Sequence, residues 1–241
     1  MAKIIIVNFL TLIRIIGTII LIPLYNLYGG LAAGLTSMIC YLTDSIDGVL
    51  ARKWKASTFF GAAFDGVADK LFTIINFIVL YMITPFAIIP IIIEILIILV
   101  QVFKFNRNLN IQSSMIGKAK VWVLAICVVA TFFVTDINSI NILSLHFKEY
   151  ILSIDASHLY FYLLLPAIIM EVLSLISYVL EIIFPENREI LHSKPKKIET
   201  PKLKGKEKYD SFKSIWLNPV FYEEHKDDTN LRDLRKISKS K

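Results

Sequence analysis

The sequence predicts an all-α, polytopic membrane protein with six transmembrane helices and with both termini in the cytoplasm. Hydrophobic residues make up 56% of the 241 residues, and the mean hydropathy is +0.63. Both values are higher than a soluble domain of this length requires for its core. Apolar runs of helical length recur along the chain, and basic residues gather in alternate connections between them.

A bilayer core of ~30 Å requires about 20 mainly apolar residues per helix. Six segments meet this requirement: 4–28, 31–51, 60–83, 86–105, 118–135 and 159–184. The first apolar stretch continues through Pro23 without a short hydrophobic core and a cleavage site, so we expect it to stay as the first span. The connection 136–158 has mixed polarity and allows either an interfacial segment or a short helix.

The distribution of basic residues predicts the orientation. With the N-terminus in the cytoplasm, only Lys148 of the basic residues in the connections falls on the outer side. The inner-side residues are Arg52, Lys53, Lys55, Lys104, Arg107, Lys118 and Lys120. Because cytoplasmic loops carry an excess of Lys and Arg, we expect a multi-pass protein of the cell membrane with cytoplasmic N- and C-termini.

Composition divides the chain into two parts. Residues 1–185 hold 11 Lys and Arg against 10 Asp and Glu, whereas residues 186–241 hold 15 against 10. We expect a six-helix transmembrane catalytic domain over 1–185 and a basic, largely disordered cytoplasmic tail over 186–241. We expect the tail to bind membrane lipids and not nucleic acid. The aromatic residues of the tail include Phe212, Trp216, Phe221 and Tyr222. They could dock on the membrane or on the body of the protein, or make no specific contact.

A few residues inside the apolar runs need separate interpretations. Cys40 and Cys127 have no C-x-x-C spacing, so we expect them to pack as small core residues. Glu94 lies near the middle of a predicted span and is a functional candidate, because an acid at that depth needs a partner. Glu181 lies close to the end of a span and could extend to the interface.

Four acids lie where the second predicted span ends and the third begins. They are Asp44, Asp47, Asp65 and Asp69. At 3.6 residues per turn, Asp44 and Asp47 share one helix face, and Asp65 and Asp69 continue a stripe that starts at Gly61. Two antiparallel helices with a short link can therefore bring the acids face to face.

Carboxylates gathered near a membrane interface repel one another unless cations compensate their charge. Oxygen ligands without nearby His or Cys favour Mg²⁺ or Mn²⁺ over zinc. The ions could also hold a diphosphate and offset the charge of a leaving group. Gly48, Ala51 and Gly61 lack bulk where a nucleotide or the facing helix approaches.

This stretch resembles the signature of the CDP-alcohol phosphatidyltransferases, D-x2-D-G-x2-A-R-x8-G-x3-D-x3-D, and matches it without a gap from Asp44 to Asp69. The resemblance implies six transmembrane helices with a metal site on the cytoplasmic side. It also implies that CDP-diacylglycerol donates a phosphatidyl group to a small alcohol, with release of CMP. Such an enzyme belongs to phospholipid biosynthesis.

The resemblance implies roles for individual residues as well. Asp44, Asp47 and Asp65 resemble the metal ligands, and Asp69 resembles the general base, which also touches the second ion. The CDP-lipid contacts would come from Gly48, Ala51, Arg52, Thr58 and Gly61. The planar cationic fork of Arg52 suits a phosphate group.

Weaker similarities point to the phosphatidylglycerophosphate synthase branch of this family, whose acceptor is glycerol 3-phosphate. The matching positions are Asn8, Thr11 and Arg14, Ala68-Asp69-Lys70, and Gly117-Lys118 with Lys120. An anionic acceptor needs cations at its phosphate, so Lys118, Lys120 and Arg14 are the expected contacts. The positive-inside rule alone explains the two lysines equally well.

Two departures leave the acceptor open. Gly66 stands where this branch usually has Pro, and Ile93 stands where an Arg commonly precedes the acid. Three other acceptors therefore remain alternatives: inositol phosphate, serine, and phosphatidylglycerol, which would give cardiolipin. A homodimer is also left open. Two other classes remain: an intramembrane prenyltransferase, whose motifs lack D-G-x2-A-R, and a cation transporter, whose acids should spread across the membrane depth.

Overall fold

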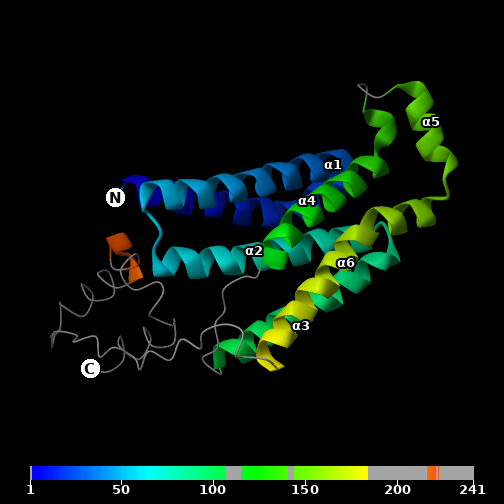
Figure 1. Cartoon of the computed structure of the whole chain (residues 1–241). Coiled ribbons are helices and arrows are strands. Elements are labelled where there is room, and N and C mark those ends of the chain that lie inside the picture. Colours follow the sequence, from blue (N-terminus) through cyan, green and yellow to red (C-terminus); the bar gives the residue numbers. More distant parts are fainter. Residues whose placement is uncertain (1, 107–114, 141–143, 184–215, 221, 223–241) are drawn as a thin grey trace, which may run out of the picture.

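The computed structural model describes residues 2–106, 115–140, 144–183, 216–220 and 222. Its elements are α1 (Ala2–Trp54), α2 (Phe59–Tyr81), η1 (Pro85–Ala87), α3 (Ile88–Asn106), α4 (Met115–Thr135), η2 (Ile137–Ser139), α5 (Leu145–Ser153) and α6 (Ala156–Ile183). All of these elements are helical, so the predicted all-α class is confirmed. Figure 1 shows the long helices packed into one elongated bundle.

Helix α1 turns back on itself at Gly29, where φ is 80° and ψ is −169°. Residues with a side chain rarely adopt such a positive φ. Asp136 stabilises the turn, because its Oδ2 accepts a hydrogen bond from the Leu31 N–H at 2.9 Å. The first half of α1 (residues 2–28) and its second half (residues 30–54) therefore lie side by side and antiparallel (Figure 1).

Small residues allow the second half of α1 to approach α4 closely. A Cβ added to Gly30 would overlap Thr135 and the Phe132 carbonyl oxygen, and one added to Gly34 would overlap the Phe133 ring. Close approach through small residues is typical of helices that pack in membranes. This packing holds the hairpin of α1 against the rest of the bundle.

A short link, residues 55–58, joins α1 to α2. Lys55 has a positive φ of 48°, and the Ala56 N–H donates to the Ala51 carbonyl at 3.0 Å. Thr58 then caps α2, because its hydroxyl oxygen accepts from the Gly61 N–H at 3.0 Å. The second half of α1 and α2 are therefore antiparallel neighbours, with the acidic motif at the end where the link joins them.

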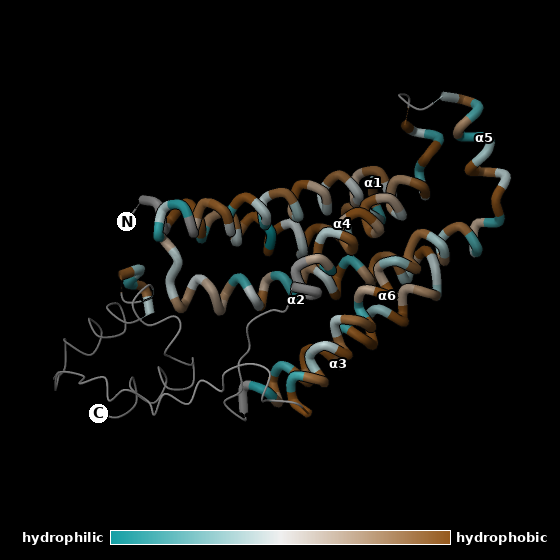
Figure 2. The backbone as a smooth tube through the Cα atoms, viewed as in Figure 1, coloured by the Kyte–Doolittle hydropathy of each residue, from teal (hydrophilic) through white to brown (hydrophobic). Residues whose placement is uncertain are grey.

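In the described part of the chain, three segments are long and apolar enough to cross a membrane: Ile5–Ala51, Pro85–Lys104 and Ala156–Ile183. Each contains an 18-residue stretch of high mean hydropathy, 2.5, 2.8 and 2.2 respectively. Ala119–Thr135 is a shorter apolar helix. Large apolar side chains such as Ile19, Leu27 and Ile126 are exposed on the outside, and apolar residues, coloured brown in Figure 2, recur along the whole length of the long helices. An outer surface of this kind suits lipid rather than water, so the chain is an integral membrane protein.

The six predicted segments correspond to the two halves of α1 and to α2, α3, α4 and α6. The number of crossings and their orientation stay predictions. Between α4 and α6 the chain forms η2 and α5, as the short-helix alternative for 136–158 predicted. Cys40 and Cys127 are buried and free, which confirms their interpretation as core residues.

The predicted division at residues 185 and 186 falls outside the described residues, as does most of the tail. The described tail residues lie near the link between α1 and α2 (Figure 1). There the Tyr222 ring packs edge-on against Phe59, with the ring centroids 5.0 Å apart. These residues of the tail therefore dock on the body of the protein.

Candidate active site

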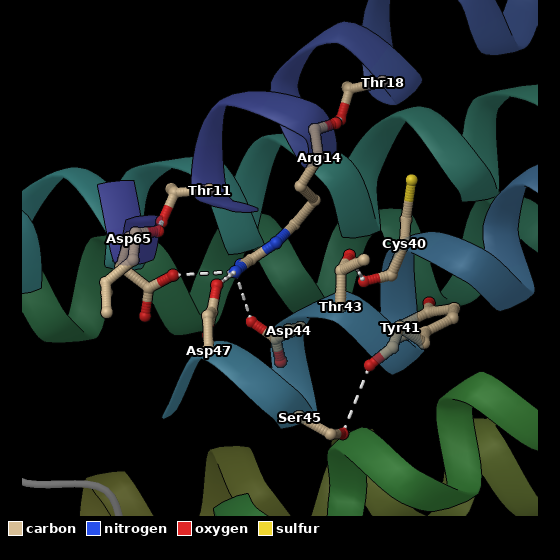
Figure 3. A network of polar contacts seen from close by, with 11 residues as sticks. Thr11, Arg14, Thr18, Cys40, Tyr41, Thr43, Asp44, Ser45, Asp47 and Asp65 are labelled. Carbon is tan, nitrogen blue, oxygen red and sulfur yellow. Dashed lines mark hydrogen bonds and ion pairs between the residues drawn. The ribbon is translucent and has the colours of Figure 1, made fainter. Parts of the chain in front are cut away.

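Three helical segments bring four charged side chains together at the acidic motif. Arg14 comes from the first half of α1, Asp44 and Asp47 from its second half, and Asp65 from α2. Figure 3 shows Arg14 reaching between the other two segments. Its Nη2 atom lies 2.5 Å from Asp44, 3.1 Å from Asp47 and 2.8 Å from Asp65.

The three carboxylates are close enough to share one cation. Each offers an oxygen, and these oxygens lie within 4.8 Å of one another. The Asp65 side chain is 44% exposed and that of Asp47 only 5%, so the group opens towards the surface on the Asp65 side. Clustered carboxylate oxygens without His or Cys are a donor set that suits Mg²⁺ or Mn²⁺, and these residues fit the divalent ion of the family.

The carboxylate oxygens of Asp69 are not among these mutually close oxygens, although the sequence predicts Asp69 as one of four ligands. It follows Asp65 by one turn of α2, about 6 Å along the helix axis. Asp44 lies ten residues before the end of α1 and Asp69 ten residues after the start of α2, so the two are at a similar height in these antiparallel helices. Asp69 and Asp44 interact electrostatically, as do Asp69 and Arg14. Among the described residues, the compact metal group therefore contains three of the four predicted acids.

The residues predicted to hold the CDP moiety surround the link between α1 and α2. Gly48 and Ala51 precede the link, and Thr58 and Gly61 follow it. Thr58 is buried and already has a structural role as the cap of α2. A Cβ on Gly61 would lie 3.3 Å from Asn8 Oδ1, so the first half of α1 closes one side of this region. The Arg52 side chain is outside the described part of the structure.

A second ionic network lies deeper in the bundle and connects four helices. Lys70 of α2 pairs with Glu94 of α3 at 2.6 Å. Lys120 of α4 pairs with the same Glu94 at 2.5 Å and with Glu171 of α6 at 3.1 Å. Two cations and two carboxylates make the network neutral, which lowers the free-energy cost of keeping it inside the bundle.

Sequence reasoning singled out Glu94 but did not find its partners. The available signal was the set of acids and lysines inside apolar spans, because each such charge needs a partner. Lys120 was expected at an acceptor phosphate, yet here it binds two carboxylates. Glu181 pairs with the buried Lys104 at 2.5 Å, so it does more than extend to the interface. The Lys118 side chain lies outside the described residues.

Comparisons with known proteins agree with the motif. A family model described as CDP-alcohol phosphatidyltransferase matches residues 4–183. The CDP-diacylglycerol–glycerol-3-phosphate 3-phosphatidyltransferase of Escherichia coli (strain K12) is 44% identical over 69 residues, which cover 26% of this chain and 36% of that protein.

The enzyme of the same name from Rickettsia typhi (strain ATCC VR-144 / Wilmington) is 40% identical over 67 residues, or 27% of this chain and 38% of that protein. The matched stretch thus spans less than two fifths of these relatives. The family model, in contrast, covers the apolar body from the first half of α1 to the end of α6. The chain therefore belongs to the CDP-alcohol phosphatidyltransferase family.

Proposed function

We propose that this protein transfers a phosphatidyl group from CDP-diacylglycerol to a small alcohol, with glycerol 3-phosphate as the acceptor, and releases CMP. The observation that carries the proposal is the convergence of Asp44, Asp47 and Asp65 within a continuous family motif. Family membership favours this chemistry over an intramembrane prenyltransferase or a cation transporter. The clustering of the acids at one end of the bundle also argues against a transport path across the membrane.

In the proposed reaction, the acceptor hydroxyl oxygen forms a bond to the phosphorus that carries the diacylglycerol. The bond from this phosphorus to the oxygen that bridges the two phosphates breaks, and CMP leaves with that oxygen. Asp69 takes the hydroxyl proton. Divalent ions, of which we propose two, would supply positive charge that offsets the charge growing on the leaving phosphate.

The position of Asp69 supports its role as the base. It lies one turn of helix away from Asp65 and nearly level with Asp44, beside the compact ligand group rather than within it. A carboxylate in this position can accept a proton from an alcohol whose acidity the nearby positive charge increases. We assign proton transfer to Asp69 as its main role and contact with the second ion as its secondary role.

The CDP moiety would lie along the link between α1 and α2. Gly48, Ala51 and Gly61 leave room for the nucleotide there, and Arg52 would bind a phosphate group through its planar fork. Thr58 would act mainly by fixing the start of α2, because its hydroxyl oxygen already accepts the Gly61 N–H.

The acceptor assignment rests on the relatives and on charge. The two relatives named above carry glycerol 3-phosphate in their names. Lys118 lies just before the apolar stretch of α4, and the proposed topology puts it on the same side of the membrane as the acidic motif. Lys120 and Arg14 already bind carboxylates, so either could reach an acceptor phosphate only after those ion pairs loosen. Lys118 is therefore the first choice for this contact.

We further propose that both termini and the metal site face the cytoplasm, in a multi-pass protein of the cell membrane. The positive-inside rule supports this orientation, because Arg52, Lys53 and Lys55 lie at the motif end of α1. The soluble acceptor and the released CMP would then exchange directly with the cytoplasm.

An acceptor panel tests the proposal. Purified protein in detergent receives CDP-diacylglycerol and Mg²⁺ with glycerol 3-phosphate, inositol phosphate, serine or phosphatidylglycerol, and CMP release is measured. We expect glycerol 3-phosphate to give the highest rate. Faster release with phosphatidylglycerol would show that Gly66 and Ile93 were the better guide to the acceptor. A variant with Asp155→Asn should give the same order of acceptors, because this exposed acid lies just before α6 and outside the motif.

A further inference from the structure

Arg14 uses its guanidinium group in an unusual way. One nitrogen, Nη2, lies within 2.5 to 3.1 Å of oxygens from Asp44, Asp47 and Asp65. A guanidinium has five N–H donors in a planar fork and usually binds a carboxylate through two of its nitrogens. Here Nε and Nη1 are buried and have no hydrogen-bond partner among the described residues. Arg14 therefore acts on the three acids as a point charge, and its remaining donors are left unsatisfied.

The nitrogen occupies the place that a divalent cation would need. The three acidic oxygens lie within 4.8 Å of one another and surround Nη2 (Figure 3). An ion bound to the same oxygens would lie about 2.0–2.6 Å from each of them, in the space that this nitrogen fills. Since two cations cannot share that space, binding of the ion requires Arg14 to move.

We propose that Arg14 is an exchangeable internal counter-ion of the acidic cluster. It holds Asp44, Asp47 and Asp65 together before a divalent ion binds, and it gives up its position when the ion arrives. The inference rests on the proposed metal site but is independent of the acceptor and of turnover. It assigns Arg14 a role in metal affinity and in the stability of the metal-free protein.

Competition of this kind has a measurable consequence. When only a fraction of molecules has an open site, the apparent Kd rises by the inverse of that fraction. If Arg14 fills the site in about nine of ten metal-free molecules, its removal tightens binding about tenfold. The metal-free form of such a variant also loses the cation that balances three neighbouring carboxylates, so it should unfold at a lower temperature.

The experiment compares Mn²⁺ binding, followed by electron paramagnetic resonance, in the wild-type protein, Arg14→Met and Lys70→Met. Lys70 is a suitable control because it also interacts electrostatically with Asp69 yet binds Glu94 rather than the cluster. Glu94 keeps Lys120 as a partner in that variant. We expect about tenfold tighter binding in Arg14→Met and less than about a threefold change in Lys70→Met.

Unfolding temperatures provide a second readout. In excess chelator Arg14→Met should unfold below the wild-type protein, and Mn²⁺ should remove most of the difference. Equal or weaker Mn²⁺ affinity in Arg14→Met would overturn the inference. So would equal tightening in Lys70→Met, because the cause would then be long-range charge rather than displacement.

If Arg14→Met does not fold, the wild-type protein still tests the inference. Phenylglyoxal modification of Arg14, mapped by mass spectrometry, should increase when Mn²⁺ binds, because the arginine leaves its buried position. Unchanged modification in the Mn²⁺-bound protein would overturn the inference. Absence of Mn²⁺ binding in every form would instead remove the proposed metal site itself.

Discussion

The Lys120 ammonium nitrogen lies 2.5 Å from Glu94 Oε2 inside the bundle, and the two side chains are only 6% and 1% exposed. Lys120 also binds Glu171, whose Oε1 is buried and has no hydrogen-bond partner in the described part of the chain. The pair connects α3 to α4, and Glu171 extends the connection to α6. These contacts therefore hold three helices together inside the bundle.

Lys120→Met should lower the free energy of unfolding by about 3 kcal/mol, because Glu171 loses its cation and must then stay charged or take up a proton inside the bundle, and either state costs free energy. The double variant Lys120→Met/Glu171→Gln should recover a large part of this loss, since a neutral amide then replaces the unpaired carboxyl group. Unfolding in detergent measures both. The exposed acid Glu149 provides a control, and Glu149→Gln should change stability by less than ~0.5 kcal/mol. A Lys120→Met protein as stable as this control would contradict the prediction.

A pair of glycines tests the turn of α1. Gly29→Ala should destabilise the protein by at least ~1 kcal/mol, because alanine is strained at a φ of 80° and its Cβ would collide with the Asp136 carboxylate. Gly66→Ala should be neutral or stabilising by up to ~1 kcal/mol, because Gly66 lies within α2 and a Cβ there meets nothing within 4 Å. In thermal unfolding, the unfolding temperatures of the two variants should shift in opposite directions or by clearly different amounts from that of the wild-type protein. Similar shifts would mean that the turn does not depend on Gly29.

Cysteine labelling tests the proposed orientation. Lys53 and Glu149 are exposed at opposite ends of the bundle, and the two native cysteines are buried at 2% and 7% exposure. In intact cells, a membrane-impermeant maleimide should label Glu149→Cys but not Lys53→Cys. Both should react after the membrane is permeabilised. The reverse pattern in intact cells would place the metal site outside.

Replacement of the proposed base tests the catalytic assignment. Asp69→Asn should reduce CMP release by about 10²- to 10⁴-fold, which is the usual contribution of general base catalysis. Mn²⁺ binding by the Asp44, Asp47 and Asp65 group should remain, because Asp69 lies outside it. Asp47→Asn should instead weaken Mn²⁺ binding. More than about a tenth of wild-type turnover in Asp69→Asn would rule out its role as the base.

The parts of this protein that the sequence predicts correctly follow from local periodicity. Helical spacing placed Asp44 and Asp47 on one face and Asp65 on the facing helix, and the length of the apolar runs separated 4–28 from 31–51, on either side of Gly29. Residues distant in the sequence were harder to place. Arg14 meets the acids only because the hairpin of α1 brings its two halves together. No local sequence pattern shows which residues of the two halves lie opposite each other.

The buried network shows the same limit. Hydropathy identifies Glu94, Lys120 and Glu171 as charges inside apolar segments, but their pairing depends on how four helices pack. The position of Asp69, the fourth acid of the motif, was also not predictable from helical spacing alone. Asp69 shares a helix face with Asp65, yet its carboxylate is not among the ligand oxygens that lie within 4.8 Å of one another.

The most direct test of the central claim follows both products of the transfer. Purified protein is incubated with CDP-diacylglycerol, Mg²⁺ and radiolabelled glycerol 3-phosphate, and CMP and lipid-extractable label are measured together. We predict that the two appear in equal amounts and that neither appears in excess chelator, because one phosphatidyl group is transferred for each CMP released. CMP release without label in the lipid, or equal formation of both products in chelator, would contradict this account.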